Sequence, residues 1–218
     1  MISDQRLQSA LQALPLFPLQ STVFFPHTLL PLHVFEDRYR QLTEHVLEGH
    51  GHLGVVWHDA ACCGGPLAGL APVACVGRVV HHERLSDGRF HLLVQGVARA
   101  TLRAELPSDG LLYRRALAER LVSDDRECTA DEVHALRACY ARLLQHCPEA
   151  GHALGELPLC LHEPCVLADV ACSCLLQDLA ARQRALAEPS VAQRLRCANE
   201  ALASLLLDGL PMPRSGPN

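Results

Sequence analysis

Cysteine and histidine carry most of the potential chemistry in this chain, which has 11 cysteines and 13 histidines in 218 residues. The densest group is Cys160, His162 and Cys165, followed by Cys172 and Cys174. Thiolates and imidazoles bind structural zinc, but they usually do so as closely spaced pairs in tight loops. Here the spacing is irregular and three of the cysteines lie in an expected helix, which favours free thiols packed in a core. We therefore expect no metal ligands and no cofactor.

Two adjacent pairs of the same residue types predict no shared site either. Cys62 and Cys63 lie in the Gly- and Pro-rich segment 59–72, which we expect to be a loop. His81 and His82 lie within an expected strand, so their side chains point to opposite faces. Surface histidines and unpaired thiols are the simpler interpretation of both pairs.

The sequence lacks the groups that hydrolytic enzymes need. None of its serines lies in a GxSxG nucleophile elbow, and every basic residue is arginine because the chain has no lysine. A P-loop needs a lysine, as do a Ser–Lys dyad and a Schiff base. We therefore expect no catalytic residues and no enzyme activity.

Composition limits the partners. Apolar residues make up 49% of the chain, and the net charge is −5. The apolar content predicts a folded globule. The negative net charge weighs against general nucleic-acid binding. No apolar run approaches the roughly 20 residues of a membrane span. The odd number of cysteines and the polar N-terminus lead us to expect a cytoplasmic protein with reduced thiols and no membrane partner.

The first 122 residues read as a β-rich barrel with one inserted helix. Prolines break the apolar runs of 14–32 into short, corner-linked strands, and helical spacing predicts a helix over about 33–48. Asp87–Gly88 predicts a hairpin turn with positive φ, and Gln95–Gly96 predicts another corner. The remaining strands are expected at 52–57, 73–85, 90–94, 97–106 and 112–118.

A helical bundle is expected from residue 123 onward. Thr129 and Glu132 form a capping-box pattern before a helix that reaches about Cys147. Pro164 suits the first turn of a helix over 164–175, and Asp178 and Ser190 are expected to cap two more. The predicted fold is therefore α+β, with a barrel at 1–122, a bundle at 123–210 and a disordered tail at 211–218.

Three sequence blocks resemble a known family. LPLFPL at 14–19, VFFPH at 23–27 and LPLHVFEDRYRQL at 30–42 are similar to the start of the N-terminal, PUA-like substrate-binding domain of Lon proteases, in its free-standing bacterial form. The hairpin block at 76–102 resembles the same family, and the segment 175–207 resembles it weakly. His27 replaces the family's usual glycine, which argues against a positive-φ turn there.

The resemblance implies a non-catalytic module that recognises polypeptides or a protein partner. Phe25 and Trp57 are the candidate aromatic anchors for binding, although packing in the core is the preferred interpretation of both side chains. Two alternatives remain open, a small-molecule sensor and a thiol-redox sensor, which would use a barrel–bundle crevice or the cysteine-rich loop. The sequence leaves the oligomeric state open.

The i, i+4 spacing of Glu36 and Arg40 predicts an ion pair on the helix expected over 33–48.

Overall fold

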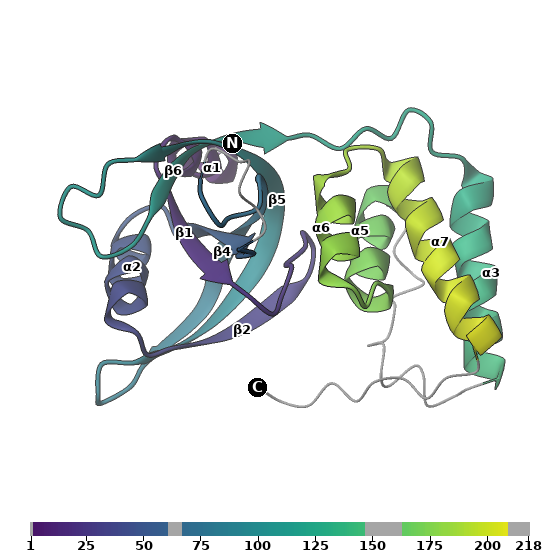
Figure 1. Cartoon of the computed structure of the whole chain (residues 1–218), viewed down its shortest axis with the longest axis horizontal. Helices are drawn as coiled ribbons and strands as arrows, with labels where there is room; N and C mark the ends of the chain where they lie inside the picture. The colour runs from purple at the N-terminus through teal and green to yellow at the C-terminus, as the bar shows by residue number, and fades with distance from the viewer. Residues whose placement is uncertain (1, 61–66, 147–162, 209–218) are drawn as a thin grey trace. The chain divides into compact units, whose positions relative to one another are not determined.

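The computed structural model describes residues 2–60, 67–146 and 163–208. The chain divides into two compact units, Met1–Val122 and Ser123–Asn218 (Figure 1). The first unit carries a six-stranded sheet with two helices, and the second unit is helical. The predicted α+β class is therefore confirmed. The tail predicted at 211–218 lies outside the described residues.

The sheet is organised around its longest strand. In sheet order the strands are β2 (Leu29–Val34), β5 (Phe90–Leu106), β4 (Val73–Arg84), β3 (His52–Trp57), β1 (Leu14–Leu19) and β6 (Arg115–Leu121). Strand β5 pairs with β4 along one side, and on its other side it pairs first with β2 and then with β6. Because β6 also pairs with β1, five strands form a closed ring, and β2 extends the sheet beyond it.

The expected corner at Gln95–Gly96 is wrong, because β5 runs through both residues. The glycine serves a close approach of two backbones. A Cβ on Gly96 would lie 2.2 Å from the carbonyl oxygen of Phe25. His27 donates its N–H to the Gly96 carbonyl at 2.9 Å, and Gly96 donates its own to Thr28 at 3.0 Å. His27 also has φ 64°, so the positive-φ turn persists without the family's glycine.

Two element boundaries differ from those expected. Helix α2 (Asp37–Glu48) begins later than residue 33, because His33 and Val34 remain in β2, paired with His91 and Phe90. Strand β6 begins at Arg115 instead of residue 112, after a loop that contains the positive-φ residues Asp109 and Gly110.

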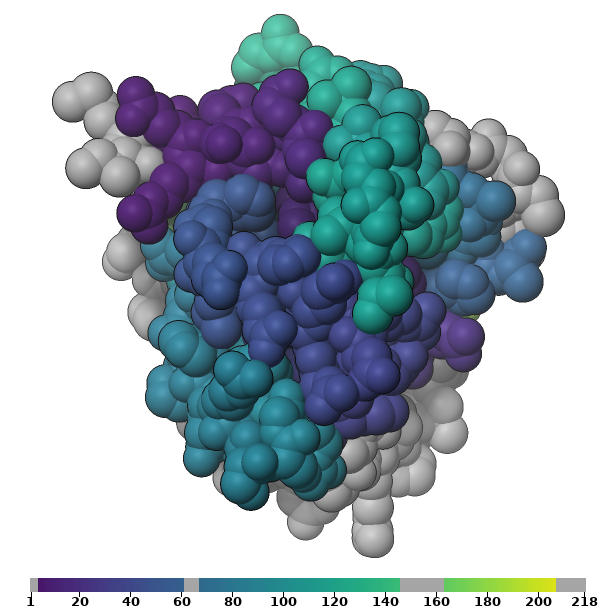
Figure 2. Space-filling model, turned by 90° about the vertical axis from the view of Figure 1, so that its left-hand side faces the viewer, coloured from purple at the N-terminus to yellow at the C-terminus, as the bar shows by residue number. Residues whose placement is uncertain are grey.

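Helix α2 holds the β5–β6 loop on one side and the β4–β5 hairpin on the other. His45 shares a 2.8 Å hydrogen bond with the Tyr113 hydroxyl, and the Gln41 side chain accepts the N–H of Leu112 at 2.8 Å. On the hairpin side, Glu44 pairs with Arg84 at 3.1 Å. Figure 2 shows α2 on the surface between these two segments. These contacts hold α2 in place on the barrel, and the start of this helix lines the site described below.

The core of the barrel is mainly aliphatic, in keeping with a sequence in which only 4% of the residues are aromatic. Helix α1 (Ile2–Gln12) contributes buried Leu7, Ala10 and Leu11. These side chains pack with buried leucines, valines and alanines from the strands of the closed ring. Burial of this apolar surface is the main stabilising contribution to the barrel.

The second unit follows its local signals closely. It contains α3 (Ala130–His146), α5 (Pro164–Leu175), α6 (Leu179–Ala187) and α7 (Val191–Asp208), and α7 packs against both α3 and α5 (Figure 1). Thr129 and Glu132 form the reciprocal hydrogen bonds of a capping box. Asp178 accepts the N–H of Ala181 at 2.7 Å, and Ser190 accepts that of Gln193 at 3.3 Å.

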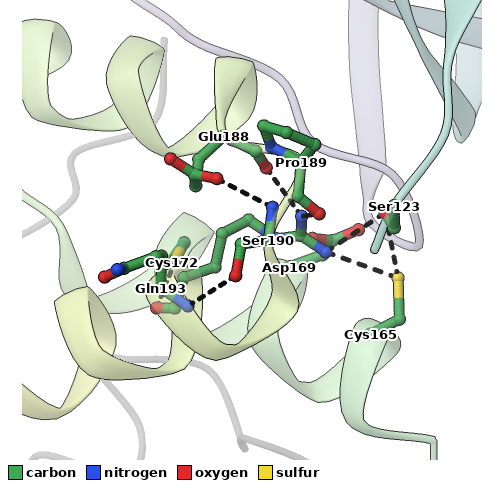
Figure 3. A network of polar contacts seen from close by, with 9 residues as sticks. Ser123, Cys165, Asp169, Cys172, Glu188, Pro189, Ser190 and Gln193 are labelled. Atoms are coloured by element: carbon green, nitrogen blue, oxygen red, sulfur yellow. Dashed lines mark hydrogen bonds and ion pairs between the residues drawn. The ribbon is translucent and has the colours of Figure 1, made fainter. Parts of the chain in front are cut away.

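A buried ion pair joins α7 to α5 within this helical unit, and Figure 3 shows the polar contacts around Asp169. The Arg194 Nε lies 3.1 Å from the Asp169 carboxylate, and both side chains are fully buried. Arg194 also donates to the carbonyls of Glu188 at 2.7 Å and Pro189 at 3.1 Å, and to the Ser123 hydroxyl at 3.2 Å. One side chain thus joins α7 to α5, to the α6–α7 connection and to the first residue of the unit.

Gly88→Val should destabilise the protein by about 1–3 kcal/mol, the usual cost of a strained backbone. Gly88 has φ +82°, as the hairpin prediction required, and a β-branched residue is strained in that region. Urea unfolding monitored by circular dichroism measures the loss. Gly88→Asn is the matched control and should lose less, because asparagine tolerates positive φ. Equal midpoints for the wild type and the valine variant would contradict this account of the turn.

Asp169→Leu should cost about 3–5 kcal/mol, because it leaves the Arg194 guanidinium buried without its counter-charge. The double variant Asp169→Leu/Arg194→Met should be more stable than Asp169→Leu, since it removes the unpaired charge. Its recovery is partial because the carbonyls of Glu188 and Pro189 lose a donor. Urea unfolding of both variants and of Arg194→Met completes the double-mutant cycle. Additive losses would show that the two side chains are not energetically coupled.

Candidate functional site

A surface groove of about 400 Å³ lies in the barrel unit, where three elements meet. The end of β1 contributes Phe17, Pro18 and Leu19, and the end of β2 contributes Leu32 and His33. The remaining lining comes from the residue after β1 and from the start of α2, namely Gln20, Phe35, Glu36, Arg38 and Tyr39. A groove of this size falls within the range of ligand pockets.

The floor of the groove is a pair of stacked aromatic rings. Phe17 and Tyr39 are both buried, and their ring centroids lie 4.2 Å apart. Burial raises the pKa of the Tyr39 phenol, an effect that Arg38 opposes and Glu36 reinforces. The phenol is therefore neutral at physiological pH. A neutral aromatic floor suits an apolar or aromatic side chain of a ligand.

The rim of the groove combines an exposed aromatic ring with a paired charge. Phe35 is 61% exposed, which is unusual for so large an apolar side chain. Arg38 lies over the Tyr39 ring at 4.6 Å and pairs with Glu36 at 2.7 Å. The predicted Glu36–Arg40 ion pair is wrong, because Arg40 pairs instead with Asp37 at 2.5 Å. Glu36 is the N-cap residue of α2 and Asp37 lies in its first turn, and each carboxylate pairs with a different arginine.

Beside the groove, one edge of β2 pairs with no strand in the described part of the chain. Gly96 of β5 donates its N–H to the Thr28 carbonyl, so the backbone polar groups of Thr28 point toward β5. This direction alternates along the strand, so the backbone polar groups of Leu30 and Leu32 also point toward β5. Leu29, Pro31 and His33 therefore direct their backbone polar groups outward. Pro31 has no N–H, but at this outward-facing position an N–H would not have bonded to β5, so the pairing of β2 with β5 loses no hydrogen bond. The edge offers three carbonyls but only two N–H donors to an incoming chain.

Neither of the two anchors proposed from the sequence belongs to the lining of this groove. Phe25 is fully buried and its backbone packs against Gly96, so a ligand cannot contact its ring in this conformation. Trp57 is half-buried at the end of β3, where it packs against the aliphatic core and donates to the Gln20 carbonyl at 3.3 Å. Phe35 is the exposed aromatic residue that the sequence analysis overlooked. The available signal was the position of Phe35 just before the start of α2, where a large apolar side chain can remain exposed.

The thiols considered for zinc or redox chemistry lie in different surroundings. On α5, Cys172 is buried and donates to the Arg194 carbonyl, whereas Cys165 lies beside the Ser123 hydroxyl. Burial raises the pKa of the Cys174 thiol, and nearby Arg182 opposes this only in part. Burial likewise raises the pKa of Cys128 and Cys197. Raised thiol pKa values weigh against redox sensing by these three residues. Cys62, Cys63, Cys160 and His162 lie outside the described residues.

Comparisons with known proteins agree on one family. The model of the ATP-dependent protease La (LON) substrate-binding domain matches residues 13–204. Lon protease of Xanthomonas oryzae is 30% identical over 84% of this chain and 22% of its own length. Lon protease of Anaeromyxobacter dehalogenans is 29% identical over 87% of this chain and 23% of its own. The chain thus spans about a quarter of the length of these curated relatives.

Solved structures show the same fold. A Lon N-terminal domain protein from Xanthomonas campestris aligns with a TM-score of 0.63 and 20% identity, over 91% of this chain and 99% of its own. The N-terminal domain of a Mycobacterium avium complex Lon protease aligns with a TM-score of 0.66 and 16% identity, over 88% and 98%. Among the described helices, none has the length and apolar character that a membrane span requires. With a family model that matches most of its length, this chain belongs to the LON substrate-binding domain family.

Proposed function

We propose that this domain recognises extended polypeptide segments, and that the groove beside β2 is where it holds them. The family's description as a substrate-binding domain of a protease supports a polypeptide as the ligand. The chain's own contribution is binding without chemistry. Among the described residues that line the groove there is no serine, threonine or cysteine, and the Tyr39 phenol is buried. The family and the thiol-rich composition support a cytoplasmic location.

The observation that carries this proposal is the unpaired edge of β2 next to an exposed aromatic ring. An extended segment adds to such an edge through main-chain hydrogen bonds, which are independent of its sequence. The N–H groups of Leu29 and His33 and the carbonyls of this edge supply those bonds. Side chains of the segment then pack on Phe35 and into the groove above the Phe17–Tyr39 floor. A binder of this kind favours unfolded chains, because folded proteins have few free backbone groups.

Leu29 supports the same assignment from the other end of the strand. Its side chain is 58% exposed, and its partner in the register is Gln95 of β5. Exposed apolar side chains at both ends of one free edge extend the contact along the whole strand. This arrangement matches a segment of about six residues, the usual length of a strand.

Phe35→Ser should weaken binding of an unfolded chain about tenfold, because it removes an aromatic anchor from the contact. The probe is fluorescently labelled α-lactalbumin, reduced and carboxymethylated so that it stays unfolded, with binding measured by fluorescence anisotropy. Native α-lactalbumin serves as the folded competitor and should not displace it. Phe35 is exposed, so the melting temperature of the variant should match that of the wild type.

Leu112→Ser is the matched control, because Leu112 is 60% exposed and lies on the β5–β6 loop outside the groove lining. Its binding should equal that of the wild type. Equal weakening by Leu112→Ser and Phe35→Ser would assign the binding to general surface hydrophobicity. Unchanged binding in Phe35→Ser would move the contact to another surface.

A further inference from the structure

A row of potential metal ligands crosses three strands on the outer face of the barrel. In the pairing register His33 of β2 lies opposite His91 of β5, and His91 lies opposite Glu83 of β4. All three side chains are exposed. The sequence analysis could not find this row, because the residues come from three segments that only the sheet brings together.

The two imidazoles are close neighbours because of where they lie in the ladder. Gly96 and Thr28 share a hydrogen bond, so alternation along this antiparallel pair makes His33 and His91 a non-hydrogen-bonded pair. Side chains at such pairs approach most closely, and the ring centroids of His33 and His91 lie 4.9 Å apart. Glu83 places a carboxylate oxygen 3.6 Å from Nδ1 of His91.

The neighbouring charged side chains determine which nitrogen of each ring carries the available lone pair. Arg89 Nη1 lies 3.2 Å from Nε2 of His33, and a guanidinium only donates, so His33 Nε2 is an acceptor. At His91 the Glu83 carboxylate favours the proton on Nδ1, which leaves the lone pair on Nε2. A carboxylate beside the far nitrogen is the usual companion of a metal-binding histidine.

We propose that His33 and His91 together chelate a divalent transition-metal ion such as Ni²⁺, Zn²⁺ or Cu²⁺, with Glu83 orienting His91. Imidazole nitrogens are common ligands for these ions. The cation displaces Arg89 from His33, and Arg89 keeps its ion pair with Asp87, whose carboxylate lies 2.6 Å away. The only bond lost is therefore one exposed hydrogen bond. This site does not depend on the proposed recognition of polypeptides.

Titration of the full chain with Ni²⁺, followed by ¹H–¹⁵N NMR, tests the site and separates it from binding by the cysteines. Paramagnetic broadening should begin at the resonances around residues 33 and 91. His33→Ala and His91→Ala should each weaken binding about tenfold or more, because each removes one arm of the chelate. The loss in the double variant should be much smaller than the sum of the two single losses, because either substitution alone already removes the chelate.

Two further variants sharpen the test. Arg89→Gln should tighten binding, because it removes a competing donor and a nearby positive charge. Glu83→Gln should weaken binding about tenfold, as loss of an orienting carboxylate does. His82→Ala is the control, because His82 is exposed on the same hairpin but pairs with Leu92 and so lies on the opposite face. Additive losses at His33 and His91, or an equal loss in His82→Ala, would overturn the proposal.

Discussion

The arrangement of the barrel depends on the contact of two backbones at Gly96. There the segment that contains Phe25 crosses β5 so closely that a Cβ would meet its carbonyl oxygen at 2.2 Å. At this crossing β5 changes its partner from β2 to β6. The ring closes because β6 pairs with both β5 and β1, whereas β2 pairs only with β5 in the described part of the chain. A free edge is therefore a direct result of how the barrel closes.

Local sequence signals predicted the elements that depend on neighbouring residues. Gly88 at its turn, Thr129 with Glu132, Pro164 and Asp178 each act within a few positions of the chain, and the structure confirms them. Each such motif satisfies backbone groups that are exposed where an element begins or turns. Such signals are legible without knowledge of the rest of the fold.

The sequence could not predict features that depend on distant segments. Gly96 looked like a corner because glycine often marks one, yet its role comes from Phe25, some seventy positions earlier. The burial of Arg194 against Asp169 also depends on two helices that are separate in the sequence. The groove likewise needs β1, β2 and α2 together, and Phe35 is conspicuous only because its ring remains exposed after folding.

Pro31 at the middle of the free edge has a consequence for which chains fit there. An incoming strand must supply an N–H to the carbonyl of Pro31, but it finds no N–H there in return. Two copies of this edge paired with each other would therefore lack donors at their centre, which disfavours aggregation through β2. A client segment with its own proline at the facing position has the same defect. In the proposed binding mode the edge therefore discriminates by backbone chemistry: it is indifferent to most side chains but disfavours proline at one register position.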